Sequence, residues 1–512
     1  MANTALKTYA NEHGGRVILL LLLFLLAIYQ FIHAGFAPFA IICAIPILVL
    51  LVIVVFRFRM TAFWALIIVN FFIMWRGRIS IPVPASLPNE LIELILIALA
   101  IIDLKDAKFE RCGNIMFFSL LIWCGFCTLE LLNDTCDIGI DVGAWYTAAR
   151  LMSFQLMYAF IVFTLYISNP KRLNQYLLVW GALALFAVFW VWKQKNIGFT
   201  DKESAWIHGP GSRTHILQAG TLIRYMSFYN DAACYGIGIS SAAVAFIIFG
   251  ITSKIKKYKY FFLITGFACL WGMFPSGTRT ATACFIAGIM AYIFLSKSFK
   301  IAVPVTIIFG IFVFILAFTT IGNGNQQIRR MRSAFDKNDK SAQDRTINQE
   351  AMKKYMVEAP WGIGMNVGYQ NVPANNKYTF MATVPPDSEY VFIWIHTGII
   401  GITIFLICTG LMLLGASWIV LFKLKSPSLR GIGAGFTCAM VAMQLGGHGN
   451  QILMQFPNCL IAYGGLTLVY VLPWIEPEWI ENENKLLTKQ EEKKRLKLEK
   501  KVNHEFNLRI EN

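Results

Sequence analysis

Uninterrupted apolar segments, many of them near 20 residues long, constrain this chain more than any other feature of its sequence. One of them, residues 391–421, contains no Asp, Glu, Lys or Arg. A helix of about 20 apolar residues crosses a hydrocarbon core of about 30 Å. These segments therefore predict membrane-spanning helices. A transmembrane barrel is excluded, because its strands alternate apolar and polar residues.

The composition supports the same reading, since 57% of the residues are apolar and only 14% are charged. Soluble globular chains carry about 25% charged residues. A soluble enzyme, a secreted disulfide scaffold and a disordered chain are thereby excluded. The eleven cysteines lie mainly within apolar runs, which indicates small buried hydrophobes rather than zinc ligands. The sequence predicts an all-α fold, a polytopic transmembrane helical bundle.

Fourteen segments are candidates for spans, and two of them are short enough to be re-entrant, so we expect 12–14 spans. An even number places both termini on one side of the membrane. The candidate spans are residues 17–33, 36–56, 60–75, 89–103, 113–132, 146–167, 173–192, 231–251, 258–274, 279–295, 299–321, 391–421, 430–446 and 457–474.

The lysines and arginines between spans predict the orientation. The loops that follow the even-numbered candidate spans contain sixteen lysines and arginines. The loops that follow the odd-numbered spans contain seven when the segment 322–390 is set aside. Positive loops stay on the cytoplasmic side, so both termini are expected there and the loops 193–230 and 322–390 are expected to face outward. The net charge of +16 then reflects orientation, and no nucleic-acid partner is expected.

Four regions follow from this pattern. Residues 1–321 hold membrane helices 1–11 with an outward loop at 193–230. Residues 322–390 form a long extracytoplasmic loop with amphipathic helices, and 391–474 hold the C-terminal membrane helices. Residues 475–512 form a charged cytoplasmic tail, whose lysines are expected to contact the headgroups of membrane lipids.

Two arginines lie at the predicted outer ends of spans, where a charge is costly and suggests function. Arg224 precedes the span 231–251, and Arg279 begins the span 279–295 directly after Pro275–Thr278. A helix N-terminus attracts anions, and a guanidinium binds phosphate oxygens in bidentate fashion. The pair therefore predicts an anion site, the alternative being arginines that extend to the outer headgroups.

The long outward loop carries further candidates. Ser341–Asp344 is typical of a helix N-terminus, and an apolar stripe follows from Ile347 to Tyr355. This predicts an amphipathic helix on the outer surface, either a lid or a support for the site through Arg345.

Asp387 and Glu389 stand just before the span 391–421. Either carboxylate could act as general base on an acceptor hydroxyl or pair with an arginine. The outward histidines His208, His215 and His448 are interpreted as incidental.

Several motifs, in this order, resemble the O-antigen ligase and O-antigen polymerase superfamily of membrane glycosyltransferases, whose fold is GT-C-like. The resemblance covers roughly residues 220–420. The motifs are Arg224–Asp231, Ser276-Gly277-Thr278-Arg279-Thr280, Ser341–Arg345, Pro360-Trp361-Gly362-Ile363-Gly364, and Asp387-Ser388 with Gly398 and Gly401.

The resemblance implies a metal-independent transferase without a cofactor, in the bacterial inner membrane with a periplasmic active face. Its donor would be an oligosaccharide on polyprenyl (undecaprenyl) diphosphate, and its acceptor a hydroxyl of a glycan or of lipid A-core. Arg224 and Arg279, supported by Arg345, would bind the diphosphate. A flippase and a chain-length regulator are the protein partners that the resemblance suggests.

Asp387 and Ser388 stand where the ligase branch has histidine and asparagine. A polymerase of O-antigen, exopolysaccharide or capsule repeat units therefore fits better than a ligase or a protein O-oligosaccharyltransferase. A lipid-linked glycan flippase is the other alternative. It would need charges deep within spans and symmetric broken helices. The suspect charges here gather at one predicted face, and Glu93 and Arg150 are exceptions that would favour a flippase.

Overall fold

A computed structural model of the chain separates into two compact units, residues 1–65 and 66–512. The residues that it describes are 57–75, 86–104, 106–217, 222–296, 340–365, 367, 372–383 and 387–510, with scattered positions within 15–29 and 303–332. The predicted span 36–56 lies outside the described residues, and the spans 17–33 and 299–321 lie largely outside them.

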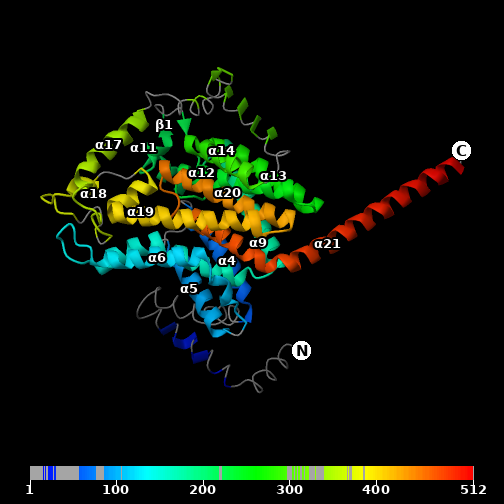
Figure 1. The fold of residues 1–512 in the computed structure, drawn as a ribbon, viewed down its shortest axis with the longest axis horizontal. Coiled ribbons are helices and arrows are strands. Elements are labelled where there is room, and N and C mark those ends of the chain that lie inside the picture. The colour runs from blue at the N-terminus through cyan, green and yellow to red at the C-terminus, as the bar shows by residue number, and fades with distance from the viewer. Residues whose placement is uncertain are drawn as a thin grey trace. The chain divides into compact units, whose positions relative to one another are not determined.

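The described residues are almost entirely helical (Figure 1). A two-residue antiparallel pair, β1 (Ile216–Leu217) with β2 (Leu222–Ile223), is the sheet found among them. The helices are α4 (Arg59–Phe72), α5 (Leu87–Ile102), α6 (Ile115–Leu129), α7 (Val142–Ala149), α8 (Gln155–Tyr166), α9 (Pro170–Asn196), α10 (Asp201–His208), α11 (Ser212–His215), α12 (Ala232–Thr252), α13 (Lys256–Gly272), α14 (Arg279–Leu295), α17 (Lys340–Met356), α18 (Thr379–Thr383), α19 (Glu389–Trp418), α20 (Pro427–Gly449) and α21 (Asn458–Ile510).

Six helical stretches within the described part of the chain are long and apolar enough to cross a membrane, which confirms an all-α polytopic membrane protein. Two shorter apolar helices, α4 and α14, also coincide with predicted spans. The six stretches are Ile115–Leu132, Val142–Tyr166, Pro170–Asn196, Ala232–Thr252, Glu389–Lys423 and Asn458–Glu492.

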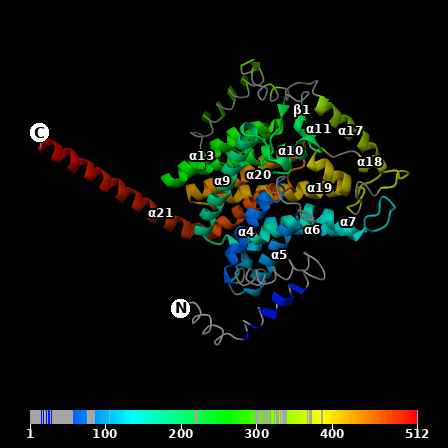
Figure 2. The same ribbon diagram turned by 180° about the vertical axis from the view of Figure 1, so that it is seen from behind.

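The core of the second unit forms around α12, which packs against α13, α14 and α20 (Figures 1 and 2). Small residues dominate α12, and such residues let membrane helices approach closely. A β-carbon on Gly288 of α14 would lie 2.8 Å from Val244 of α12. The close contact between these helices therefore depends on the absence of a side chain at position 288.

The last helix, α21, continues without a break into the charged tail predicted from residue 475. Its polar part is rich in Lys, Glu and Leu, which are strong helix formers. Glu476 accepts hydrogen bonds from the backbone N–H groups of Lys425 and Ser426, both at 2.7 Å. One turn further on, Trp479 donates to Ser428 Oγ at 3.0 Å.

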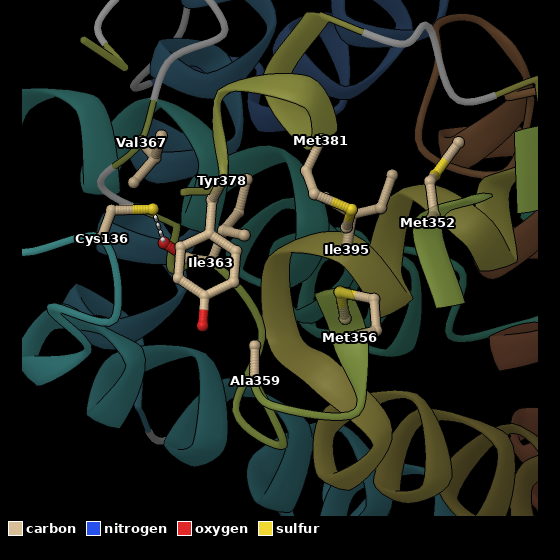
Figure 3. Packing of buried hydrophobic residues seen from close by; sticks show 9 residues of the cluster. All are labelled: Cys136, Met352, Met356, Ala359, Ile363, Val367, Tyr378, Met381 and Ile395. Carbon is tan, nitrogen blue, oxygen red and sulfur yellow. Dashed lines mark hydrogen bonds between the residues drawn. The ribbon is translucent and has the colours of Figure 1, made fainter. Parts of the chain in front are cut away.

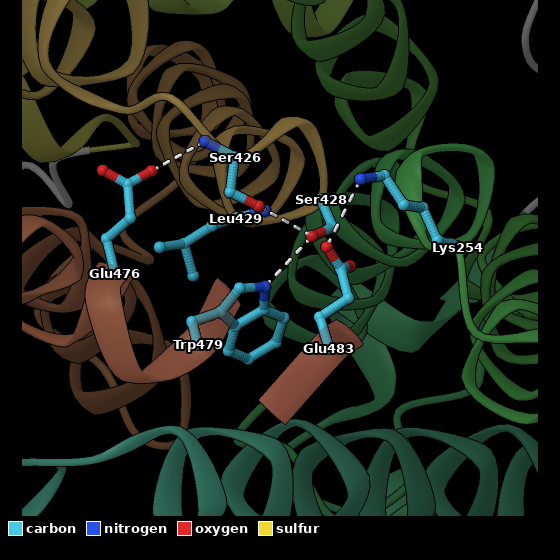
Figure 4. Close-up of polar contacts among 7 residues, drawn as sticks. All are labelled: Lys254, Ser426, Ser428, Leu429, Glu476, Trp479 and Glu483. Carbon is cyan, nitrogen blue, oxygen red and sulfur yellow. Dashed lines mark hydrogen bonds and ion pairs between the residues drawn. The ribbon is translucent and has the colours of Figure 1, made fainter. Parts of the chain in front are cut away.

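At the same end of α20, Glu483 forms an ion pair of 3.4 Å with Lys254 (Figure 4). Helix α21 is thus joined both to the start of α20 and to the turn between α12 and α13.

Candidate functional site

The loop that follows α9 is held in place by one carboxylate. Thr200 and Glu203 form a capping box at the start of α10. The Oε1 atom of Glu203 also accepts hydrogen bonds from Trp75 at 2.9 Å, Trp190 at 3.0 Å and Gln194 at 3.0 Å. Burial by itself raises the pKa of Glu203, but the hydrogen bonds from Thr200, Trp190, Trp75 and Gln194 outweigh it, and the pKa lies below 4.5.

Arg224, which follows β2 in the same loop, is partly buried and uses all three of its nitrogens. Nε donates to Ser276 O at 3.1 Å, Nη1 to Thr214 O at 2.9 Å, and Nη2 to Thr278 Oγ1 at 2.9 Å. Each Nη atom carries a second N–H group. The guanidinium therefore fixes the loop to the segment before α14 and retains donors for an anion.

Arg279 is the residue directly after Thr278 and opens α14. The pKa of Arg224 is lowered mainly by burial; the carboxylate of Asp231 raises it, and the positive charge of Arg279 has a smaller lowering effect. The two arginines predicted as a pair therefore lie in one region, which also contains the carboxylate of Asp231. Two cations gathered at a helix N-terminus form a region of positive potential.

Arg345 and Asp387 form a second pair. Arg345 Nε lies 3.7 Å from Asp387 Oδ2, and both side chains are partly exposed, at 34% and 50%. Arg345 belongs to α17, whereas Asp387 stands two residues before α19. The structure therefore brings together two candidates that are 42 residues apart in the sequence.

Glu389 has a different environment from Asp387, although only one residue separates them. It is 2% exposed, and its Oε2 atom accepts hydrogen bonds from the backbone N–H groups of Ile452 and Leu453, both at 2.8 Å. Its carboxylate thus holds the turn between α20 and α21 against the start of α19.

The C-terminal end of α20 connects the two pairs. Ser388 donates to Gly447 O at 3.1 Å on one side. On the other side Asn450 Nδ2 donates to Thr280 Oγ1 at 3.4 Å. The residues between them include the exposed His448. The starts of α14 and α19 therefore both contact the end of α20, and Arg279 and Asp387 are the sequence neighbours of the contacting residues Thr280 and Ser388.

A cluster of buried residues attaches the long loop to the helices (Figure 3). The cluster joins α17, α18 and the segment after α17 to α19 and to the connection between α6 and α7. Its members are Cys136, Met352, Met356, Ala359, Ile363, Val367, Tyr378, Met381 and Ile395. Burial of the larger aliphatic side chains is worth about 1.5–3 kcal/mol each, so the described part of the loop is packed against these helices.

Helix α17 occupies the segment where an amphipathic helix was predicted, but the predicted apolar stripe is buried only in part. Met352 and Met356 are buried, but Ile347 at the start of the predicted apolar stripe is 63% exposed.

The glycine-rich turn after α17 packs directly on the backbone of α19. Ile363 N donates to Ile395 O at 2.9 Å, and Gly364 N donates to His396 O at 3.1 Å. Gly398 interrupts α19 with a φ of 63°, and a β-carbon there would lie 2.0 Å from Pro360 O. The glycine-rich turn Pro360–Gly364 therefore lies directly against the backbone at Gly398 of α19. The sequence alone did not reveal this contact.

The histidines occupy three different environments. His215 is buried, and its Nε2 atom accepts a hydrogen bond of 3.1 Å from the backbone N–H group of Ala232, the first residue of α12. His208 is exposed on α10. His448, which the sequence analysis interprets as incidental, is exposed near the C-terminal end of α20, between Gly447 and Asn450. Within the described part of the chain, no group of three or more His, Cys, Asp or Glu residues is arranged to hold a metal ion.

Residues 264–406 match the family described as O-antigen ligase, a range that contains Arg279, Arg345, Asp387 and Glu389 but not Arg224. No match was found among curated proteins. The matched range contains four of the five motifs on which the resemblance to O-antigen ligases and polymerases depends, and the match is therefore in agreement with that resemblance.

Proposed function

We propose that this protein transfers a glycan from a polyprenyl diphosphate to a hydroxyl of an acceptor glycan, and that it polymerises repeat units of O-antigen, exopolysaccharide or capsule. The observation that carries the proposal is the gathering of Arg224 and Arg279 at the start of α14. A departing diphosphate develops negative charge, and fixed cations at a helix N-terminus stabilise that charge.

The reaction needs a base as well as a cation pair. In the proposed step the acceptor oxygen attacks the anomeric carbon, the bond from that carbon to the diphosphate oxygen breaks, and the diphosphate leaves with the electron pair. The hydroxyl proton passes to Asp387, whose exposed carboxylate is accessible to an acceptor. Arg345 orients this carboxylate through the 3.7 Å ion pair.

Glu389 is the weaker candidate for the base, because two backbone N–H groups already occupy its buried carboxylate. Its removal would disturb the turn at Ile452 and Leu453 rather than the proton transfer alone. His448 is the second candidate, since it is exposed near the C-terminal end of α20. The variants Asp387→Asn and His448→Gln separate these two assignments.

A ligase with the same donor is the alternative activity, and the family match favours it by name. The polymerase is preferred because Asp387 and Ser388 replace the residues of the ligase branch. The proposal includes an inner-membrane location with both termini cytoplasmic and the proposed catalytic site facing the periplasm, as the loop charges indicate. A flippase and a chain-length regulator would then act with this protein.

The experiment compares Arg279→Lys with Arg213→Lys in cells that lack the native protein, at equal expression. Arg213 is an exposed arginine of the same predicted outward region, so it serves as the matched control. Lysine keeps the positive charge but lacks the planar guanidinium that binds phosphate oxygens in bidentate fashion. Loss of long-chain glycan in Arg279→Lys alone supports the proposal, and normal chain length in that variant contradicts it.

Analysis of the glycans that accumulate in the deletion distinguishes the activities. Single repeats on lipid A-core indicate a polymerase. Polymer that remains on undecaprenyl diphosphate indicates a ligase, and repeats trapped on the inner leaflet indicate a flippase.

A further inference from the structure

A groove with a volume of about 740 Å³ lies between the start of α6, the end of α19 and the middle of α21. Its lining combines two cations with aromatic side chains, an arrangement distinct from the apolar helix surfaces around it. The lining includes Arg111, Asn114, Trp418, Lys423 and Trp474.

This groove is separate from the proposed catalytic site at Asp387 and Arg279. Glu389 and Trp418 mark the two ends of α19 and are 29 residues apart in the sequence. Gly398 interrupts α19, but the part from Gly398 to Trp418 alone is about 30 Å long at 1.5 Å per residue, which equals the thickness of a hydrocarbon core. The groove therefore lies at the opposite membrane boundary from the proposed catalytic site.

Arg111 is the residue that points to a ligand. It is 5% exposed, its Nη1 donates to Ser168 O at 3.1 Å, and its guanidinium carbon lies 5.9 Å from the ring centroid of Trp474. Its Nε atom is buried and has no hydrogen-bond partner. An unsatisfied buried donor on a charged group is costly. A phosphate oxygen in the groove would satisfy it.

The other lining residues suit a lipid rather than a soluble anion. Trp418 and Trp474 are 57% and 53% exposed, and tryptophans of this kind concentrate at the membrane interface. Lys423 is exposed at the end of the π-helical turn that extends α19. A lysine at a helix C-terminus also offsets the helix dipole, so Lys423 supports the assignment and Arg111 carries it.

We propose that the groove binds the phosphate headgroup of an acidic phospholipid from the leaflet opposite the proposed catalytic site. Arg111 and Lys423 contact the phosphate, and the two tryptophans flank the glycerol and the upper acyl chains. The bound lipid fixes α6, α19 and α21 against one another. This inference is independent of the proposed transferase activity.

The test measures lipid binding to the purified full-length chain in neutral detergent, by native mass spectrometry and by the midpoint of thermal unfolding. Phosphatidylglycerol, phosphatidylcholine and inorganic phosphate are titrated separately. Phosphatidylglycerol is expected to bind more tightly than phosphatidylcholine and to raise the midpoint more, whereas inorganic phosphate has little effect.

Two variants have matched controls. Lys423→Gln is expected to weaken phosphatidylglycerol binding about fivefold, and the exposed neighbour Lys425→Gln is expected to leave it unchanged. Arg111→Gln is expected to weaken it about tenfold or more. Arg172→Gln, which removes another arginine bonded to the Ser168 region but outside the groove, is expected to retain the lipid preference.

Several results would overturn the proposal. Equal binding of the two phospholipids would remove the role of the acidic headgroup. Equal losses in Lys423→Gln and Lys425→Gln would show general surface attraction. A full shift of the midpoint with inorganic phosphate alone would show that the groove takes any small anion and not a lipid. Because Lys423 is exposed, its variant remains informative if Arg111→Gln does not fold.

Discussion

Arg224 donates from Nη2 to Thr278 Oγ1 at 2.9 Å, across 54 residues of sequence. Thr278 in turn donates to Ala232 O at 3.1 Å, so one chain of hydrogen bonds joins the loop before α12 to the starts of α12 and α14. The position of Arg279 depends on this chain, since it follows Thr278 directly. The proposed diphosphate site is thus a product of the tertiary structure around Arg224.

Replacement of Arg224 by Lys should impair both stability and transfer. Lysine has one nitrogen and cannot satisfy Ser276, Thr214 and Thr278 together. We expect a loss of about 1–3 kcal/mol in the free energy of unfolding, measured by thermal or denaturant unfolding in detergent.

A double-mutant cycle that combines Arg224→Lys with Thr278→Val isolates the hydrogen bond between Arg224 and Thr278. A coupling energy near zero would show that this hydrogen bond contributes nothing.

Replacement of Gly398 by Ala should detach the glycine-rich turn Pro360–Gly364 from α19. Alanine at a φ of 63° is strained, and its β-carbon would meet Pro360 O at 2.0 Å. We expect a loss of about 2–4 kcal/mol in the free energy of unfolding together with a large loss of transfer. Gly410→Ala in the same helix is the control, since no atom lies within 4 Å of its β-carbon. Equal stability of the two variants would contradict the packing of the turn on α19.

The pair Arg345 and Asp387 can be tested by exchange of its charges. The exposed ion pair is worth little, below about 1 kcal/mol, so Asp387→Asn should leave unfolding nearly unchanged. If Asp387 accepts the acceptor proton, transfer should fall about 10²- to 10⁴-fold. The double variant Arg345→Asp/Asp387→Arg restores an ion pair but no carboxylate at position 387, so it should stay inactive. Recovery of activity in the double variant would assign a purely structural role to the pair.

Acid should release the loop that Glu203 holds. The folded-state pKa of Glu203 lies below its ordinary value of 4.5. The stability that it contributes is therefore present above about pH 4.5 and is lost as the pH falls through the lower folded pKa. Because Trp75 and Trp190 donate to this carboxylate, tryptophan fluorescence during acid titration follows the change.

Glu203→Gln is expected to remove this part of the pH dependence, whereas Glu350→Gln, at an exposed position of α17, should retain it. Identical acid profiles of the native chain and Glu203→Gln would contradict the assignment.

Much of the fold could be predicted from local pattern. Apolar length alone identified the segments that become α6, α8, α9, α12, α19 and α20, because crossing a membrane requires a continuous apolar helix. The cap at Ser341–Asp344 and the apolar stripe likewise indicated α17. The end of α21 was less predictable, since its charged residues are good helix formers and the helix continues through the expected boundary at 475.

The sequence by itself therefore determined the class of the protein, the helical segments and a short set of charged candidates. Only the tertiary structure decided what those candidates do. Asp387 and Glu389 have the same local pattern, yet the first meets Arg345 and the second meets the backbone at Ile452 and Leu453. The reason is physical: local periodicity reports which residues form a helix, whereas the partner of a side chain depends on which distant segment folds back beside it.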